Sequence, residues 1–190
     1  MAAEVPQGHL HLLEHRLKLL SIHRGGTYCR LAQADWRDPL SGAYSQIDGG
    51  RWNAPGSFPV VYLNRDERVA RANVIRKFRD QAIQLEDLIP EAAPSLAVTV
   101  VPEGEYVDIV TDEGCVAAGL PATYPTDAGG AMVGWESCRP VGQSAWDDGH
   151  PGIACRSAAP TAPLVGEELA FFDRGEPLQL VEVRGFAQWF

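Results

Sequence analysis

The sequence contains no apolar run long enough to cross a membrane. Its cleanest runs, such as residues 96–101, are far shorter than the roughly 20 residues that a bilayer requires. The first residues also lack the basic head and the following apolar stretch of a secretory signal. We therefore expect a cytoplasmic protein without a membrane partner.

Basic residues are scarce relative to acidic ones. Sixteen Lys and Arg stand against 25 Asp and Glu, which gives a formal net charge of −9. Nonspecific nucleic-acid binding depends on neutralising phosphates with basic side chains, so this balance argues against a nucleic-acid partner. It still allows a local basic pocket for a small phosphate ligand.

Cysteine is also scarce, and its positions argue against a common type of metal site. The four cysteines are scattered and form no C-x-x-C pair, so a zinc ribbon is not expected. Free thiols fit a reducing cytoplasm. We predict neither structural disulfides nor a bound metal.

The length of 190 residues fits one domain with a short extension. Residues 8–22 carry leucines at helical spacing and are followed by Arg-Gly-Gly at 24–26, which predicts an amphipathic helix that stops there. The chain is therefore divided into an N-terminal helical extension, residues 1–24, and one domain, residues 25–190.

Residues 60–63 form a short β-branched and aromatic run that predicts a buried strand. A helix should follow at once, with Asn64 as its N-cap and Glu67 completing a pair that resembles a capping box. Its buried stripe is expected to comprise Ala70, Val74, Phe78, Ala82 and Leu85.

The other expected elements are mostly short strands. A long loop is predicted over residues 33–59 and a short helix near residues 141–147. Strands are predicted at 28–32, 96–101, 106–110, 152–155, 169–172 and 178–183. Short strands with few helices favour an α+β fold.

Residues 11–15 read HLLEH and match the H-x-x-E-H pattern of inverted zinc peptidases. On a helix, His11 and His15 would share one face and could bind zinc beside Glu14. The pattern is short, and no downstream helix offers an evident acidic third ligand. A solvated helix face is therefore the favoured interpretation, with a zinc peptidase as an alternative.

The most distinctive stretch is residues 49–56, GGRWNAPG. Its glycines let the backbone approach a ligand closely, and Arg51 offers a planar fork for phosphate or carboxylate. Trp52 offers a face for stacking or packing. The alternative is a Gly/Pro turn whose Arg51 pairs with an acid such as Asp48. A P-loop is excluded because Gly-Lys-Ser/Thr is missing.

Four residues on or just after predicted strands have two interpretations each. Arg30 lies in an apolar strand and needs an anion, from a salt bridge or from a ligand. Tyr62 faces either the core or a ligand. Cys155 is favoured as a buried structural thiol, because no His is placed to pair with it. Ser157 follows a strand end, where ligand groups gather in such sheets, or it lies at an ordinary exit from strand to loop.

These stretches follow one order along the chain: YxR at 28–30, GGRWN at 49–53, PVVYL at 59–63, a helix, and GI followed by SA within 152–158. In this order they resemble the RES domain family, the toxins of bacterial RES–Xre toxin–antitoxin pairs. The resemblance covers roughly residues 25–175, so the domain of residues 25–190 is named RES-like.

The resemblance implies an ADP-ribosyltransferase-like fold, with a mixed or antiparallel sheet core and flanking helices, and a pocket for NAD⁺. Family members consume NAD⁺ by phosphorolysis or hydrolysis, or transfer ADP-ribose to a protein. By position, Arg30 and Arg51 would hold the pyrophosphate or a phosphate nucleophile. Tyr28 and Trp52 would be further cofactor-binding residues.

Two more roles come from the same resemblance. Tyr62 would pack on nicotinamide or its ribose, and Ser157 would hydrogen-bond near that ribose or the phosphate. Both are counted as catalytic and cofactor-binding candidates, together with Arg51. The implied partners are NAD⁺, inorganic phosphate and an Xre-type antitoxin, in a homo-oligomer or a toxin–antitoxin hetero-oligomer.

One position departs from the family pattern. The family has a glutamate on the helix after the conserved tyrosine, and Asn73 stands there, eleven residues after Tyr62. Cleavage of the nicotinamide–ribose bond passes through an oxocarbenium-like state. An amide can hydrogen-bond a ribose hydroxyl but supplies no charge. Glu67 or Asp66 would take the role only if the alignment were shifted.

Functions of different classes follow from these residues. The first is a toxin that degrades NAD⁺ and is neutralised by its antitoxin, with Asn73 among its catalytic residues. The second is a catalytically weakened or inactive RES-like module that binds NAD⁺, which Asn73 favours. A third is an ADP-ribosyltransferase acting on a protein. The sequence does not say whether phosphate, water or a protein is the acceptor.

Overall fold

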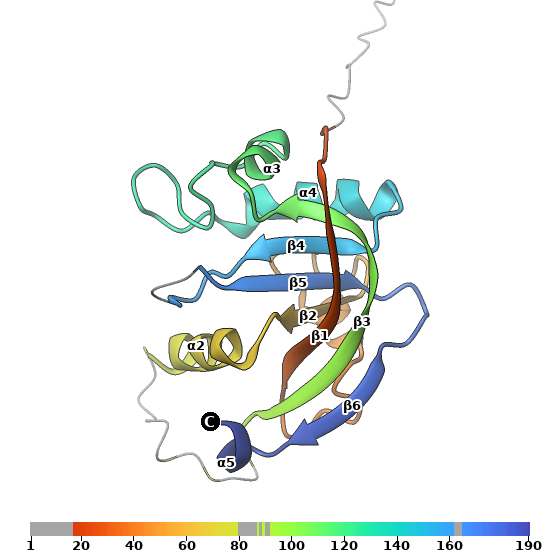
Figure 1. Ribbon diagram of the computed structural model, residues 1–190, viewed down its shortest axis with the longest axis vertical. Helices are drawn as coiled ribbons and strands as arrows, with labels where there is room; N and C mark the ends of the chain where they lie inside the picture. The colour runs from red at the N-terminus through yellow and green to blue at the C-terminus, as the bar shows by residue number, and fades with distance from the viewer. Residues whose placement is uncertain (1–16, 80–86, 88, 90–91, 162–164) are drawn as a thin grey trace, which may run out of the picture.

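The computed structural model describes residues 17–79, 87, 89, 92–161 and 165–190. Within them, a curved mixed sheet of six strands is flanked by helices (Figure 1). The strands are β1 (Ser21–Ala32), β2 (Val60–Asn64), β3 (Ser95–Ile109), β4 (Gly152–Arg156), β5 (Glu167–Phe172) and β6 (Gln179–Arg184). The helices are α1 (Ala43–Asp48), α2 (Glu67–Phe78), α3 (Asp112–Ala117), α4 (Trp135–Asp147) and α5 (Phe186–Trp189).

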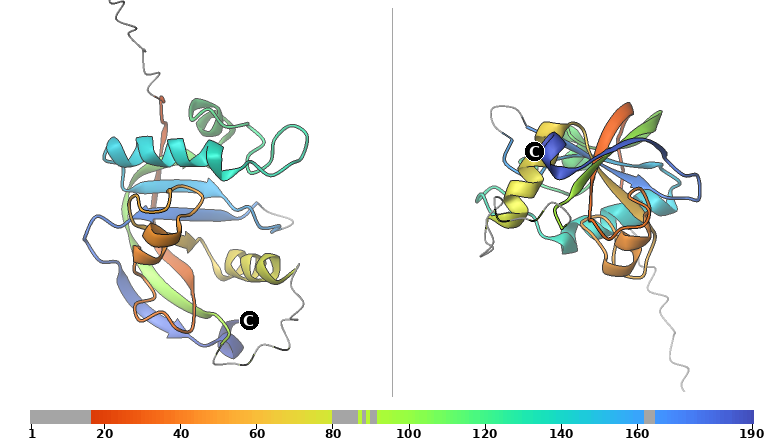
Figure 2. Two further views of the ribbon diagram at one scale, coloured as in Figure 1. Left: turned by 180° about the vertical axis from the view of Figure 1, so that it is seen from behind. Right: turned by 90° about the horizontal axis from the view of Figure 1, so that it is seen from below.

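The sheet has the order β1-β2-β5-β4-β3-β6, and β1 also pairs with β3. Five strands therefore close on one another, and β6 lies outside them against β3. Only the β3–β4 pair is parallel among the described strands. Figure 2 shows α1 and α4 on the side of the sheet that faces away from the viewer in Figure 1. The α+β prediction, with a mixed sheet and flanking helices, is confirmed.

The predicted N-terminal helix is wrong where the structure describes it. Ser21 and Ile22 begin β1, which pairs with β3 from Ser21↔Val107 to Ala32↔Ser95, and residues 24–26 form a bulge in that pairing rather than a helix end. The long-range partner outweighs local helical spacing here. Residues 8–16 of the prediction lie outside the described residues, and the division at residue 24 stays a prediction.

The two strands predicted at 96–101 and 106–110 are one continuous strand, β3. The segment between them contains Pro102 and Gly104. The chain stays extended there, because β1 pairs with β3 on both sides of this segment. The strands predicted near β2, β4, β5 and β6 are confirmed.

Helix α2 follows β2 as predicted, but its cap is different. The N-cap is Asp66, whose Oδ1 accepts a hydrogen bond from the backbone N–H of Val69 at 2.9 Å. Asn64 is instead the last residue of β2. Glu67 forms ion pairs with Arg71 and Arg184 and does not cap the helix.

The buried face of α2 consists of Val69, Ala70 and Val74, with Phe78 partly buried. Ala82 and Leu85 lie outside the described residues. The helix predicted near residues 141–147 is confirmed as the second half of α4, which begins at Trp135 and accommodates Pro140 in its second turn. The sequence did not indicate α1, α3 or α5, which have six residues or fewer.

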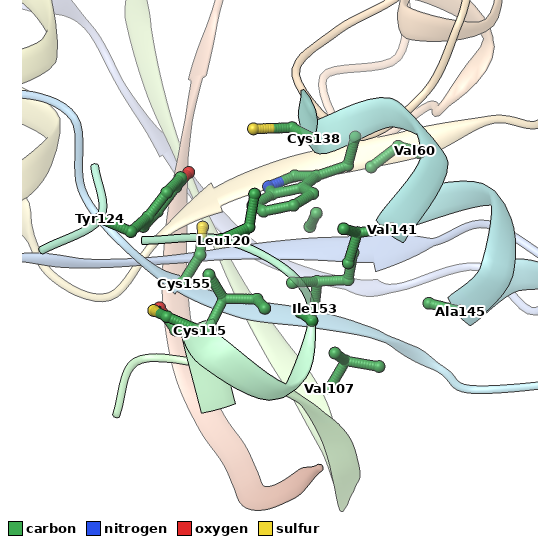
Figure 3. Close-up of a cluster of buried hydrophobic side chains, with 14 of the residues drawn as sticks. Val60, Val107, Cys115, Leu120, Tyr124, Cys138, Val141, Ala145, Ile153 and Cys155 are labelled. Atoms are coloured by element: carbon green, nitrogen blue, oxygen red, sulfur yellow. The ribbon is translucent and has the colours of Figure 1, made fainter. Parts of the chain in front are cut away.

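The main core lies between the sheet and α4 (Figure 3). Three thiols, Cys115, Cys138 and Cys155, are buried in it, and Cys29 is buried under α2. All four are free. Burial raises the pKa of Cys155 well above its ordinary value. The prediction of a buried structural thiol at Cys155 is therefore confirmed.

No helix among the described residues combines the length and the apolar character that a membrane span needs.

Candidate functional site

A cleft of about 770 Å³ lies where α1, α2, β2 and β5 meet. Segments that are distant in the sequence form its walls: the loop after β1, the glycine-rich stretch after α1, the cleft-facing side of β2 and the second half of α2. The cleft therefore exists only in the assembled sheet.

Basic side chains line one part of this cleft. They are Arg30, Arg51, Arg76 and Lys77. Four cations around one cavity suit an anionic ligand, and the guanidinium groups can bind phosphate through two hydrogen bonds at once. The local basic pocket that the acidic composition allowed is thus present.

Arg30 is 3 % exposed and has neutral partners. Its Nη1 donates to the carbonyl oxygens of Pro39 at 3.1 Å and Ser41 at 2.9 Å, and its guanidinium lies 4.7 Å from the Trp36 ring centroid. Among the described residues it forms no ion pair, so the structural salt bridge considered from the sequence is absent. Burial lowers the pKa of Arg30 to about 10.

Arg51 is also without an ionic partner in the described part of the chain. Its Nη1 donates to the carbonyl oxygen of Val133 at 3.2 Å, and Asp48 does not pair with it. The alternative of a turn stabilised by an Arg51–Asp48 ion pair is therefore wrong. Arg51 is half-buried and also forms a side-chain hydrogen bond with Cys138, and its five N–H groups leave further donors for a ligand.

The Tyr62 hydroxyl is fully occupied by protein. It accepts a hydrogen bond from the Trp52 backbone N–H at 2.9 Å and donates to Asn53 Oδ1 at 2.8 Å. Asn53 is itself buried and donates to the carbonyl oxygens of Ser45 and Phe58. The hydroxyl fastens the glycine-rich stretch to β2, which leaves the ring of Tyr62 to line the cleft.

Gly50 explains why this stretch begins with glycine. A Cβ at Gly50 would lie 2.3 Å from the Tyr62 hydroxyl oxygen, which is far inside contact distance. The glycine lets the backbone that carries Arg51 lie directly against the Tyr62 ring.

Aromatic rings form a second part of the wall. Trp36 and Tyr44 are stacked with centroids 4.2 Å apart, and Trp135 stands nearby at the start of α4. Sequence reasoning missed all three. Trp36 and Tyr44 were hidden in a stretch interpreted only as a long loop, and an aromatic pair within such a polar loop is the signal that could have found them.

Two predicted binding residues are not at the cleft. Trp52 is 1 % exposed and packs in the main core. Tyr28 is also buried, and its hydroxyl donates to Glu167 at 3.4 Å, among residues that do not line the cleft. Their side chains support the walls rather than face a ligand.

Asn73 and Ser157 meet at a residue that sequence reasoning missed, Glu168. Asn73 Nδ2 donates to Glu168 Oε1 at 2.8 Å and to Asn64 Oδ1 at 2.9 Å. Ser157 Oγ donates to the same Glu168 Oε1 at 2.6 Å. Glu168 lines the cleft, whereas Ser157 lies behind it. The sequence offers only a weak indication of Glu168, which is one of two adjacent acidic residues just before a predicted strand.

The structure therefore brings together Arg30, Arg51, Tyr62, Asn73 and the unpredicted Glu168. The cations, aromatic rings and carboxylate that line the cleft suit a ligand with phosphate groups and an aromatic ring that carries positive charge. No group of three His, Cys, Asp or Glu side chains that could hold a metal occurs among the described residues. The HLLEH stretch lies outside them.

Known proteins are similar to this chain in sequence and in fold. The family model for the RES domain matches residues 27–189. The protein named NAD⁺ phosphorylase MbcT, in Mycobacterium bovis and in Mycobacterium tuberculosis H37Rv, is 30% identical over 146 residues, 76% of this chain and 73% of that protein. The crystal structure of the M. tuberculosis MbcT–MbcA toxin–antitoxin complex is similar with a TM-score of 0.68 and 28% identity, covering 87% of this chain and 86% of that one.

Proposed function

The chain belongs to the RES domain family, and from this premise we propose that it is a toxin that degrades NAD⁺ by phosphorolysis and that a cognate antitoxin neutralises it. The observation that carries the proposal is the cleft, which combines two arginines without ionic partners in the described chain, an aromatic wall and a carboxylate. The phosphorolytic outcome and the antitoxin are taken from the relatives named NAD⁺ phosphorylase and from the toxin–antitoxin complex.

The reaction places clear demands on such a cleft. The bond between the ribose anomeric carbon and the pyridinium nitrogen breaks, and its electron pair stays on nitrogen, so nicotinamide leaves as a neutral molecule. An oxygen of inorganic phosphate forms the new bond to the same carbon and gives a phosphorylated ADP-ribose. Because the ribose becomes oxocarbenium-like on the way, negative charge near it and a fixed pyrophosphate both lower the barrier.

Different residues of the cleft would meet these demands. Arg30 and Arg51 would bind the pyrophosphate or the attacking phosphate through their guanidinium forks. The Tyr62 ring and the stacked Trp36–Tyr44 pair would hold the two aromatic ends of NAD⁺. The proposal places this activity in the cytoplasm, where NAD⁺ and the antitoxin are both available, and needs no metal.

The test is incubation of the purified chain with NAD⁺, with and without inorganic phosphate, followed by separation and mass measurement of the products. We expect NAD⁺ loss that depends on phosphate and yields nicotinamide and a phosphorylated ADP-ribose. Loss without phosphate dependence would identify a hydrolase. Transfer to a protein would appear as an added ADP-ribose mass.

A second candidate, the NAD⁺-binding module without turnover, is favoured by Asn73 in place of the family's glutamate. The same experiment separates it from the toxin. NAD⁺ binding measured by calorimetry, with no product formed in phosphate, would support the module and contradict the enzyme. Lack of both binding and turnover would contradict both functions.

A further inference from the structure

Four polar side chains from different elements form one hydrogen-bonded cluster at the wall of the cleft. Asn64 ends β2, Asn73 lies in the middle of α2, Glu168 lies near the start of β5, and Ser157 follows β4. Three of their mutual contacts are 2.6–2.9 Å long. Glu168 is the one charged member of this cluster. The other three members come from β2, from α2 and from the residues after β4.

The direction of every bond in this cluster can be assigned. Asn64 Nδ2 donates to the Cys29 carbonyl, so its Oδ1 is the atom turned to Asn73. Asn73 must therefore present its NH₂ group, and its second hydrogen goes to Glu168 Oε1. Ser157 Oγ accepts from the Ala159 N–H, which leaves its hydroxyl hydrogen for Glu168. The neighbours of Glu168 are thus donors to an acceptor-only carboxylate.

Glu168 is also on the face of the sheet that lines the cleft. It lies opposite Asn64 in the β2–β5 pairing, and Ala170 lies opposite Tyr62 two residues along. Residues two apart on a strand share a face, so Glu168 lies beside Tyr62. Both bonds of Glu168 end on Oε1; within the described residues, Oε2 has no hydrogen-bond partner and the carboxylate has no ion pair.

The pairing of Asn73 with Glu168 accounts for the departure from the family pattern. A glutamate at position 73 would direct its carboxylate at Glu168 Oε1 and Asn64 Oδ1, two acceptors that are 2.8 and 2.9 Å from the present amide nitrogen. Like charges at such separation repel strongly. The cluster therefore accommodates one negative charge, and in this chain that charge is on β5.

On the basis of the proposed function, we propose that Glu168 is the catalytic carboxylate of this chain and that Asn73 and Ser157 are its positioning residues. The Oε2 side of Glu168 faces the ribose of bound NAD⁺. Its charge stabilises the oxocarbenium-like state while the bond to nicotinamide breaks and the bond to phosphate forms. The helix position at which the resemblance implies a glutamate is here Asn73, a donor that orients Glu168.

The decisive variant is Glu168→Gln, whose amide oxygen can still accept both hydrogen bonds while the charge is lost. We expect kcat for NAD⁺ consumption to fall by about 10²–10³, the usual effect of removing one electrostatic contact to a transition state. The Kd for NAD⁺ should change less than about threefold. The matched control is Glu167→Gln, an adjacent acid that pairs with Arg24 and is not in the cleft wall; its kcat should stay at the wild-type value.

Moving the carboxylate from position 168 to position 73 distinguishes a catalytic role of Glu168 from a merely structural one. The double variant Asn73→Glu with Glu168→Gln returns the carboxylate to α2 and should recover at least about tenfold in kcat over Glu168→Gln alone. Asn73→Glu alone places two carboxylates together and should lower the melting temperature. Glu168→Asp keeps the charge on a shorter arm, and its intermediate kcat supports the role even where the glutamine variant folds poorly.

The two proposals fail in different ways. An active wild type whose Glu168→Gln variant keeps its kcat within threefold overturns the role of Glu168 and leaves the proposed function standing. An equal loss of kcat in Glu167→Gln, or no recovery in the relocated double variant, also overturns that role. A wild type that consumes no NAD⁺ in phosphate overturns the proposed function and this inference together.

Discussion

At the scale of single residues, the polar group of a cleft side chain can form hydrogen bonds within the protein while the rest of the side chain lines the cleft. The Tyr62 hydroxyl fastens the glycine-rich stretch to β2, and the ring remains for the cleft. Trp52 contributes a backbone N–H to the same contact while its indole fills the core. A motif residue can therefore matter for function without reaching the substrate.

Gly50→Ala is expected to disturb this contact directly. The new Cβ would lie 2.3 Å from the Tyr62 hydroxyl oxygen, and such overpacking costs about 1–3 kcal/mol. The melting temperature should fall by roughly 2–10 °C for a chain of this size, together with NAD⁺ consumption. Gly104→Ala is the matched control, because a Cβ there meets its nearest atom at 3.8 Å. Equal melting temperatures for the two variants would contradict the steric explanation.

Arg51→Ala should separate binding from stability. Its protein contacts are a hydrogen bond to the Val133 carbonyl and one to Cys138, whose combined loss costs about 2 kcal/mol and a few degrees of melting temperature. A charge-assisted contact to phosphate is worth about 1.5–3 kcal/mol, so the Kd for NAD⁺ should rise by roughly ten- to hundredfold. Calorimetry and thermal unfolding measure both effects. A collapse of stability with unchanged affinity would make Arg51 structural.

At the scale of elements, local patterns predicted β2, β4, β5 and β6 because each is a short apolar run with turn residues beside it. The same reasoning found only residues 28–32 of β1. It predicted a helix up to residue 22, because the leucines there have helical spacing, and the pairing of β1 with the distant β3 outweighs that spacing. It also failed for the cap of α2: Asn64 was taken into the β2–β5 ladder, and Asp66 was left to accept from Val69.

The candidate site was predicted only as far as its motifs. Arg30, Arg51, Tyr62 and Asn73 were named from the resemblance and do line the cleft. Glu168 was not, because nothing within β5 indicates that a hydrogen bond from α2 and another from the residue after β4 end on it. Its position depends on strand register, which a single sequence does not display.

Asp66→Ala tests how the start of α2 supports the site. Loss of an N-cap costs about 1 kcal/mol, so the melting temperature should fall by roughly 2–4 °C. Helix α2 also carries Asn73, which orients Glu168. A loosened first turn should therefore disturb this contact, so that kcat falls several-fold while the affinity for NAD⁺ is retained. Glu176→Ala, in an exposed loop, is the control and should leave both quantities unchanged. A lowered melting temperature with an unchanged kcat would show that the N-cap of α2 does not affect the position of Glu168.

At the scale of the whole molecule, the buried thiols and phenols predict sensitivity to alkali. Burial raises the pKa of Cys29 from 9.0 to about 12 and the pKa values of Tyr28 and Tyr106 from 10.0 to about 12. Between those values the folded chain retains protons that the unfolded chain has released. Stability is therefore complete below about pH 9 and falls as the pH rises toward 12.

Thermal unfolding across pH 8–11 checks this expectation. The melting temperature should be nearly level up to pH 9 and then fall with each unit of pH. The Cys29→Ser variant has no thiol to titrate at position 29. Its melting temperature should therefore decrease less steeply just above pH 9. A melting temperature that stays constant to pH 11 would show that these groups titrate alike in the folded and unfolded chains.

The pairing of β2 with β5 has a consequence during synthesis of the protein on the ribosome. Tyr62 and Glu168 lie on neighbouring strands but far apart in the chain, and strands joined over such distances pair late in folding. A ribosome that has finished β4 has produced Arg30, Arg51, Tyr62 and Asn73 but not Glu168, the carboxylate that accepts a hydrogen bond from Asn73. On the proposed function, NAD⁺ consumption can therefore begin only once synthesis has passed β5.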